Sequence, residues 1–127
     1  MNFHNAVNQY KDVENISKVE TADKHKFILL VLEELHKNLN TLIYTIENDK
    51  KLSPAKSKSF SKIISSLMIL MNSLDFENGE PIASNLFNLY EYCRNEVLVG
   101  YKELKTDGIK SAENVISDIL SSWKEIN

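Results

Sequence analysis

The side chains of this chain that could do chemistry include one histidine on a charged segment. Glu33-Glu34-Leu35-His36 contains the Glu-x-x-His spacing that di-metal four-helix bundles use, because residues three apart project from one side of a helix. Such a site needs a second Glu-x-x-His and two further glutamates. The other histidines, His4 and His25, have no glutamate at that spacing. We therefore expect no metal site.

The pair His36-Lys37 could also suggest a phosphotransfer histidine, and Cys93 could suggest a nucleophile. However, His36 lies beside Leu32 and Ile43, and no small residues clear an approach to its ring. Cys93 falls inside an apolar helical stripe, where a free cysteine usually behaves as a small buried hydrophobic residue. The sequence has no phosphate-binding glycine loop and no zinc spacing. We expect neither an enzyme nor a cofactor-binding protein.

The composition is that of a globular protein of one domain. Of the 127 residues, 43% are hydrophobic and 26% are charged, and the formal net charge is −3. Lysines alternate with acidic residues, so no basic face for nucleic acid is expected. The longest apolar runs, such as residues 27–32, are far shorter than the roughly 20 residues of a membrane span. A single cysteine and the lack of a signal-peptide pattern favour the cytoplasm.

Four segments carry apolar residues at the helical spacing of three and four. They are separated by breaks at residues 47–54, at residues 75–80 around Gly79, and near Gly108. Ser53-Pro54 predicts a helix start, with serine as the N-cap and proline at the first helical position, and Pro81 marks another start. Thr106 or Asp107 is expected to cap the last helix. The predicted core stripes are Ile28, Val31, Leu32, Leu35, Leu39, Leu42, Ile43 and Ile46; Phe60, Ile63, Ile64, Leu67, Leu70, Met71 and Leu74; Ile82, Leu86, Leu89, Tyr90, Cys93, Val97, Tyr101 and Leu104; and Ile109, Ala112, Val115, Ile116, Ile119, Trp123 and Ile126.

Helices of this length with short connections predict an all-α protein. We expect residues 21–127 to form an antiparallel up-and-down four-helix bundle. Residues 1–20 form a separate N-terminal arm, in which Phe3, Val7, Tyr10 and Val13 have helical spacing. An isolated helix this short is marginal in water, so the arm is expected to be ordered only by docking on the bundle.

Several apolar residues fall outside the core stripes when each helix is projected at 100° per residue. Contiguous exposed apolar surface on a globular protein commonly marks a partner site, although single exposed apolar residues are normal. We interpret these residues as grooves for a helical or extended client, with the arm as a cover. Arg94 lies beside two of them and could pair with a client carboxylate, or could be an ordinary solvated charge. The off-stripe residues are Leu29, Leu30, Tyr44, Met68, Ile69, Phe87, Tyr92, Leu98 and Val99.

Four stretches of the chain resemble the FliS family of flagellin-specific export chaperones. They are Tyr10 in the arm, TADKHKFILLVLEEL at 21–35, LDFENGEPIASNLFNLYEYC at 74–93, and ILSSWKEI at 119–126. The order and spacing of these stretches match over essentially the whole chain. The sequence departs from the family pattern at Lys24, Glu34, Glu80-Pro81 and Gly100-Tyr101, and these departures bear on which flagellin would be the client more than on the fold.

The resemblance implies a cytoplasmic bundle that binds the disordered C-terminal segment of flagellin and delivers it to the flagellar export apparatus. It also implies that the N-terminal segment can occupy part of the groove when no client is bound, and it points most directly to Tyr10. The other expected client-binding residues come from the helical projection. The full expected set is Tyr10, Leu29, Leu30, Met68, Ile69, Phe87, Tyr90, Arg94 and Leu98.

One alternative uses the same surplus apolar residues differently. A generic helical adaptor, or a self-associating bundle, would bury them in a homodimer interface. We expect a monomer or a weak dimer, and light scattering with and without a flagellin segment separates the two interpretations.

Overall fold

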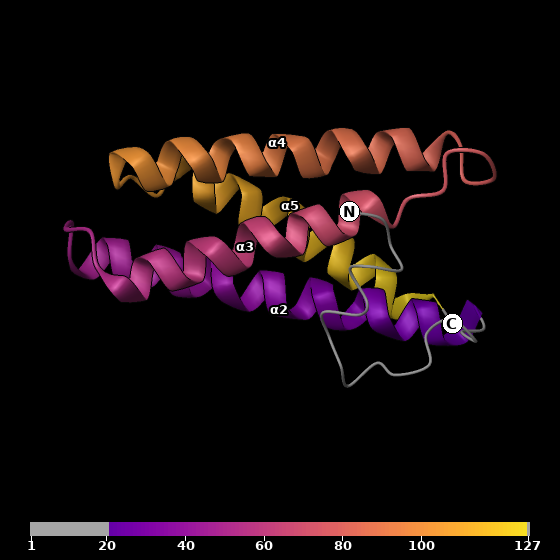
Figure 1. Ribbon diagram of the computed structural model, residues 1–127, viewed down its shortest axis with the longest axis horizontal. Helices are drawn as coiled ribbons and strands as arrows, with labels where there is room; N and C mark the ends of the chain where they lie inside the picture. Colours follow the sequence, from indigo (N-terminus) through magenta and orange to yellow (C-terminus); the bar gives the residue numbers. More distant parts are fainter. Residues whose placement is uncertain (1–20, 127) are drawn as a thin grey trace.

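The computed structural model describes residues 21–126, and these residues form four helices (Figure 1). They are α2 (Thr21–Asn48), α3 (Pro54–Asn72), α4 (Ile82–Glu103) and α5 (Asp107–Glu125). Successive helices run in opposite directions, and each packs against two others. Helix α2 contacts α3 and α5, α4 contacts the same two helices, and the contact between α3 and α4 is the least extensive. The predicted all-α four-helix bundle is confirmed; the predicted arm, with Tyr10, lies outside the described residues.

The ends of the helices follow local capping chemistry. Ser53 is the N-cap of α3, and its hydroxyl accepts a hydrogen bond from the backbone N–H of Lys56 at 3.2 Å, as predicted. At the start of α4, the carboxylate of Glu80 caps the helix by accepting a hydrogen bond from the backbone N–H of Ser84 at 2.7 Å. The N-cap position of α5 is Thr106, whose side chain makes no capping hydrogen bond. Asp107 lies in the first turn of α5, where its carboxylate interacts favourably with the positive end of the helix dipole.

The core is formed largely by the predicted stripes, but four buried apolar residues were not assigned to one, namely Phe27, Ile69, Ala83 and Leu120. Phe27 is 2% exposed although it was not assigned to a stripe, and Ile69 is 1% exposed although the projection placed it on the outer side of its helix. Both residues belong to the central cluster. A helix covered by two neighbours buries a wider arc than one stripe, and α2 and α3 each have two neighbours. The prediction that Ile69 is an outer residue is therefore wrong.

Other stripe residues are more exposed than expected because they lie near helix ends or at the edge of the core. Ile82 opens α4 and is 65% exposed, and Ile126 follows the end of α5 and is 53% exposed. Leu89 is 39% exposed. The stripe continues in sequence past the point where a neighbouring helix is present to cover it.

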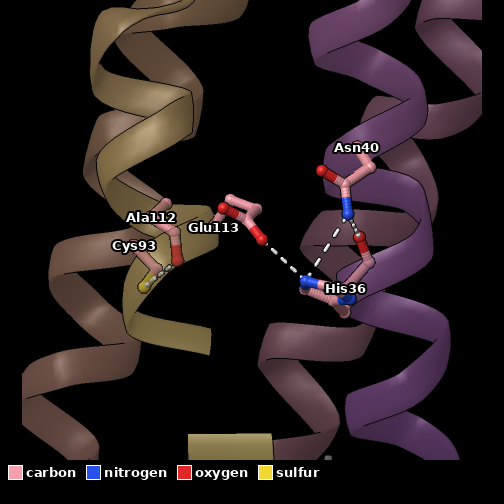
Figure 2. Close-up of polar contacts among 5 residues, drawn as sticks. All are labelled: His36, Asn40, Cys93, Ala112 and Glu113. Carbon is pink, nitrogen blue, oxygen red and sulfur yellow. Dashed lines mark hydrogen bonds and ion pairs between the residues drawn. The ribbon is translucent and has the colours of Figure 1, made fainter. Parts of the chain in front are cut away.

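Polar contacts fix the register of α5 along α2. His36 Nε2 lies 2.6 Å from Glu113 Oε2, and the two side chains face each other across the two helices (Figure 2). Lys110 Nζ lies 2.6 Å from a carboxylate oxygen of Glu47 near one end of the pair. At the other end, Trp123 Nε1 donates to the carbonyl oxygen of His25 at 3.0 Å. These contacts hold the end of α5 beside the start of α2.

The two candidate reactive side chains, His36 and Cys93, both contact α5. His36 is engaged by Glu113 and lies 3.4 Å from the side-chain nitrogen of Asn40, and residues 21–126 contain no cluster of three or more His, Cys, Asp or Glu side chains placed to hold a metal ion. Cys93 is fully buried, and its Sγ lies 3.7 Å from the carbonyl oxygen of Ala112 (Figure 2). Burial raises the pKa of the Cys93 thiol to about 12, with a smaller contribution from the Glu96 carboxylate, so the thiol stays protonated at neutral pH.

Candidate functional site

An apolar groove opens at one end of the bundle and has a volume of about 1000 Å³. All four helices contribute to it, because the start of α2, the end of α3, the start of α4 and the end of α5 meet there. This is the right-hand end of the bundle in Figure 1. We call it the end groove. The lining residues are Lys24, His25, Ile28, Asn72, Ser73, Leu74, Asp75, Phe76, Glu77, Gly79, Ile82, Ala83, Leu86, Tyr90, Trp123 and Ile126.

One rim of the end groove is the turn between α3 and α4, which Asp75 organises. Asp75 Oδ1 accepts hydrogen bonds from the backbone N–H groups of Glu77 and Asn78 at 3.0 and 3.1 Å, and Oδ2 accepts from the Asn78 side chain at 3.1 Å. The Asn78 bonds, above all, lower the pKa of the Asp75 carboxyl. Gly79 completes the turn, because a Cβ there would lie only 2.6 Å from the carbonyl oxygen of Asp75.

The same turn presents Phe76 to the mouth of the end groove. Phe76 is 47% exposed and lies edge-on to Phe87 of α4, with the ring centroids 6.0 Å apart. The turn is thus an apolar wall as well as a connection. Its ordered backbone keeps a large aromatic side chain near the surface without burying it.

The opposite wall is held by Trp123 near the end of α5. Its ring stacks on His25 of α2, with centroids 4.9 Å apart and planes at 10°. Together with the hydrogen bond from Trp123 Nε1 to the His25 carbonyl, this stacking fixes the indole against α2. One face of a large, rigid aromatic ring is therefore available to line the groove.

The most deeply buried residues of the groove lining are Tyr90, Ala83 and Ile28, whose exposed fractions are 3%, 4% and 8%. Burial raises the pKa of the Tyr90 phenol above its usual value, with a smaller contribution from Cys93, so its hydroxyl is neutral at physiological pH. The rim carries both signs of charge: Lys24 lies on the side of α2, and Asp75 and Glu77 lie on the turn. An apolar floor with a mixed rim suits an amphipathic segment better than a small anion or cation.

Among the expected client-binding residues within 21–126, only Tyr90 lines the end groove; Tyr10 lies outside the described residues. Phe87 is partly buried beside the end groove through its contact with Phe76. Leu30, Met68 and Leu98 are exposed, at 53%, 51% and 44%, but they lie outside the groove.

The remaining expected residues are less accessible than predicted. Leu29 is partly buried against the core, and Ile69 is buried within it. Arg94 makes an ion pair with Glu91 of its own helix at 3.6 Å and is partly exposed, which agrees with a solvated charge. The structure thus brings Tyr90 and Phe87 to one end of the bundle and leaves the exposed members of the set along its sides.

The sequence projection missed most of the end groove. Ile28, Leu74, Ile82, Leu86, Trp123 and Ile126 were all assigned to core stripes, and Phe76 was read as part of a turn. The one available signal was Phe76, since a large aromatic residue in a turn has no helix face to join. The others could not be told from core residues, because they share the same helical period.

Comparisons with known proteins cover nearly the whole chain. The flagellar secretion chaperone FliS of Salmonella typhimurium (strain LT2) is 28% identical over 122 residues, which span 95% of this chain and 89% of that protein. The flagellar secretion chaperone FliSB of Pseudomonas aeruginosa is 25% identical over 122 residues, spanning 96% and 95%. The flagellar secretion chaperone FliS of Vibrio cholerae serotype O1 is 23% identical over 117 residues, spanning 92% and 85%. The family model for the flagellar protein FliS matches residues 6–127, so the chain belongs to the FliS family.

Proposed function

We propose that this protein is an export chaperone that binds the disordered C-terminal segment of flagellin. Membership of the FliS family supports the proposal, together with the end groove and its large, accessible apolar side chains. By holding that segment in the cytoplasm, the chaperone would keep flagellin from polymerising before export and would bring it to the flagellar export apparatus. This is a binding activity and requires no catalytic group.

The end groove is the observation that carries the proposal. Ile82 and Phe76 are 65% and 47% exposed at its mouth, so a client could cover them without unfolding the bundle. Burial of apolar surface is worth about 25 cal/mol per Å², so about 1,000 Å² would supply roughly 25 kcal/mol before costs. Ordering a disordered client removes much of that free energy. Submicromolar binding without a strong polar anchor is consistent with this balance.

The exposed apolar residues along the bundle would extend the contact. Leu98 on α4 and Met68 on α3 lie outside the end groove and are each about half exposed. A client that begins in the end groove and continues along the bundle would bury them in turn. We also propose that the N-terminal arm, residues 1–20, competes with the client as an intramolecular cover.

The test is calorimetric titration of the full chain with the C-terminal segment of flagellin from the same cell. We expect saturable 1:1 binding and a large negative heat-capacity change, the marker of apolar burial. Light scattering on the same samples should show a monomer that becomes a 1:1 complex. A tight dimer that the flagellin segment leaves unchanged would instead support the homodimer interpretation.

A matched pair of variants locates the binding surface. Ile82→Asp places a charge at the mouth of the end groove, where the wild-type residue is 65% exposed. Leu52→Asp places the same charge on the connection between α2 and α3, where the wild-type residue is 68% exposed and does not line the groove. That connection lies at the opposite end of the bundle (Figure 1). We expect Ile82→Asp to weaken binding at least tenfold, since a charge would be desolvated by the client, and Leu52→Asp to bind like the wild type. Equal affinities for the two variants would show that the client does not use the end groove.

A further inference from the structure

Tyr90 differs from every other large side chain that lines the end groove, because it is almost fully buried and yet carries a polar group. Only 3% of its surface is exposed. Within residues 21–126, its hydroxyl makes no hydrogen bond. Every fully buried side-chain nitrogen or oxygen in the described part of the chain has a partner. The oxygen of the unpartnered Tyr90 hydroxyl is therefore not fully buried, and the open space that Tyr90 lines is the end groove.

This placement has an energetic consequence for any occupant. In the empty groove, the hydroxyl can be satisfied by water. A purely apolar client that filled the groove would remove that water and leave a buried hydroxyl unpaired, which is unfavourable. A client that offers a hydrogen-bond acceptor at this point would replace the water and avoid the penalty. The neighbouring lining residues, Ala83, Leu86 and Ile28, have no side-chain hydrogen-bonding group that could do so.

We propose that the Tyr90 hydroxyl donates a hydrogen bond to a backbone carbonyl of the bound client segment, at a point where the client helix ends or is interrupted. The inference rests on the proposed client-binding function. Inside a continuous helix the carbonyls are already bonded, whereas the last four carbonyls of a helix, and those of an extended stretch, are free. The groove thus selects for a helix end flanked by bulky apolar side chains, and not only for apolar surface.

The first experiment compares Tyr90→Phe with Tyr101→Phe in the full chain, using the C-terminal segment of flagellin as the probe. Each substitution removes one hydroxyl from α4, but Tyr101 stacks on Phe60 and does not line the groove. We expect Tyr90→Phe to bind about tenfold more weakly, which is the size of one neutral hydrogen bond, and Tyr101→Phe to bind like the wild type. Thermal unfolding without client should give Tyr90→Phe a melting temperature at least equal to that of the wild type, because the hydroxyl has no partner to lose.

The second experiment finds the client carbonyl. In a series of synthetic flagellin segments, one backbone amide at a time is replaced by an ester, whose carbonyl is a weaker acceptor. One position, at a helix end or break, should lose affinity for the wild type and lose none for Tyr90→Phe. The outcomes separate the two proposals: no binding to the wild-type chain contradicts the proposed function. Wild-type binding that Tyr90→Phe leaves unchanged contradicts only the role of the hydroxyl.

Discussion

At the scale of single residues, Gly100 sets how closely α4 and α5 can approach. A Cβ at this position would lie 2.6 Å from Cγ1 of Ile109 and 2.9 Å from the carbonyl oxygen of Lys105. The second contact is with backbone, which cannot move aside as a side chain can. Gly108 also faces a close neighbour, but that neighbour is the flexible carboxylate end of Glu96. The two glycines therefore tolerate a methyl group differently.

We expect Gly100→Ala to destabilise the bundle by about 1–3 kcal/mol, as overpacking typically does. Helix propensity alone would favour alanine by about 1 kcal/mol, so the sign of the change shows which effect is larger. Gly108→Ala is the matched control and should change stability by less than Gly100→Ala. Urea unfolding followed by circular dichroism measures both. Stabilisation by Gly100→Ala would contradict the close packing of α4 on α5.

The ionisation of the Cys93 thiol makes the free energy of unfolding depend on pH in the alkaline range. Its pKa is raised from 9.0 to about 12 in the folded chain, so the unfolded chain ionises first. The stabilisation tied to this group is complete below pH 9 and is lost as the pH rises toward 12. The free energy of unfolding of the wild type, relative to Cys93→Ala, should therefore be constant up to about pH 8.5 and then fall. Urea unfolding of the two proteins at pH 7, 9 and 10.5 checks this, and a constant difference would count against it.

At the scale of helices, polar contacts between α2 and α5 set the register that brings the groove walls together. The His36–Glu113 contact is 2.6 Å long, and its side chains are 29% and 21% exposed. It requires the proton on Nε2, since a carboxylate can only accept. The Lys124–Glu33 contact is 4.0 Å long, with side chains 53% and 46% exposed. The first contact should matter more because it is shorter and less hydrated.

Double-mutant cycles to alanine test this comparison. We expect a coupling of about 0.5–1 kcal/mol for His36 with Glu113, and close to zero for Lys124 with Glu33. Each cycle compares the free energy of unfolding of the wild type, both single variants and the double variant at neutral pH. Equal coupling energies for the two pairs would mean that neither the shorter distance nor the lower exposure strengthens the His36–Glu113 contact.

At the scale of the whole molecule, the end groove lies where the described chain begins. Lys24 and His25 line the groove, and they follow residues 1–20, the proposed arm, by only a few positions in the sequence. Trp123, the single tryptophan of the chain, lines the same groove. Its fluorescence can therefore report on occupation of the groove by a flagellin segment that contains no tryptophan.

Deletion of residues 1–16 tests the proposed competition. If the arm competes with the client, the shortened chain should bind the flagellin segment more tightly, as followed by Trp123 fluorescence. Tyr10→Ala should change the affinity in the same direction but by less. Weaker binding by the shortened chain would show that the arm contributes contacts to the complex. An unchanged affinity would contradict both roles.

The sequence alone determined the elements and most of the core. Helical periodicity and capping are local, so the four helices, the Ser53 cap and the central stripes could be predicted from neighbouring residues. The family resemblance was also readable from the order of short motifs, and the comparisons confirm it.

Only the tertiary structure decided which apolar residues are accessible. A helical projection treats each helix alone, but exposure depends on how many neighbours cover it and on where they stop. For this reason Ile69 proved to be buried, while Ile82 and Ile126 proved to be exposed. The end groove combines residues near positions 24–28, 72–90 and 123–126, which are far apart in the chain. Packing of four helix ends brings them together, and no local pattern in the sequence records that packing.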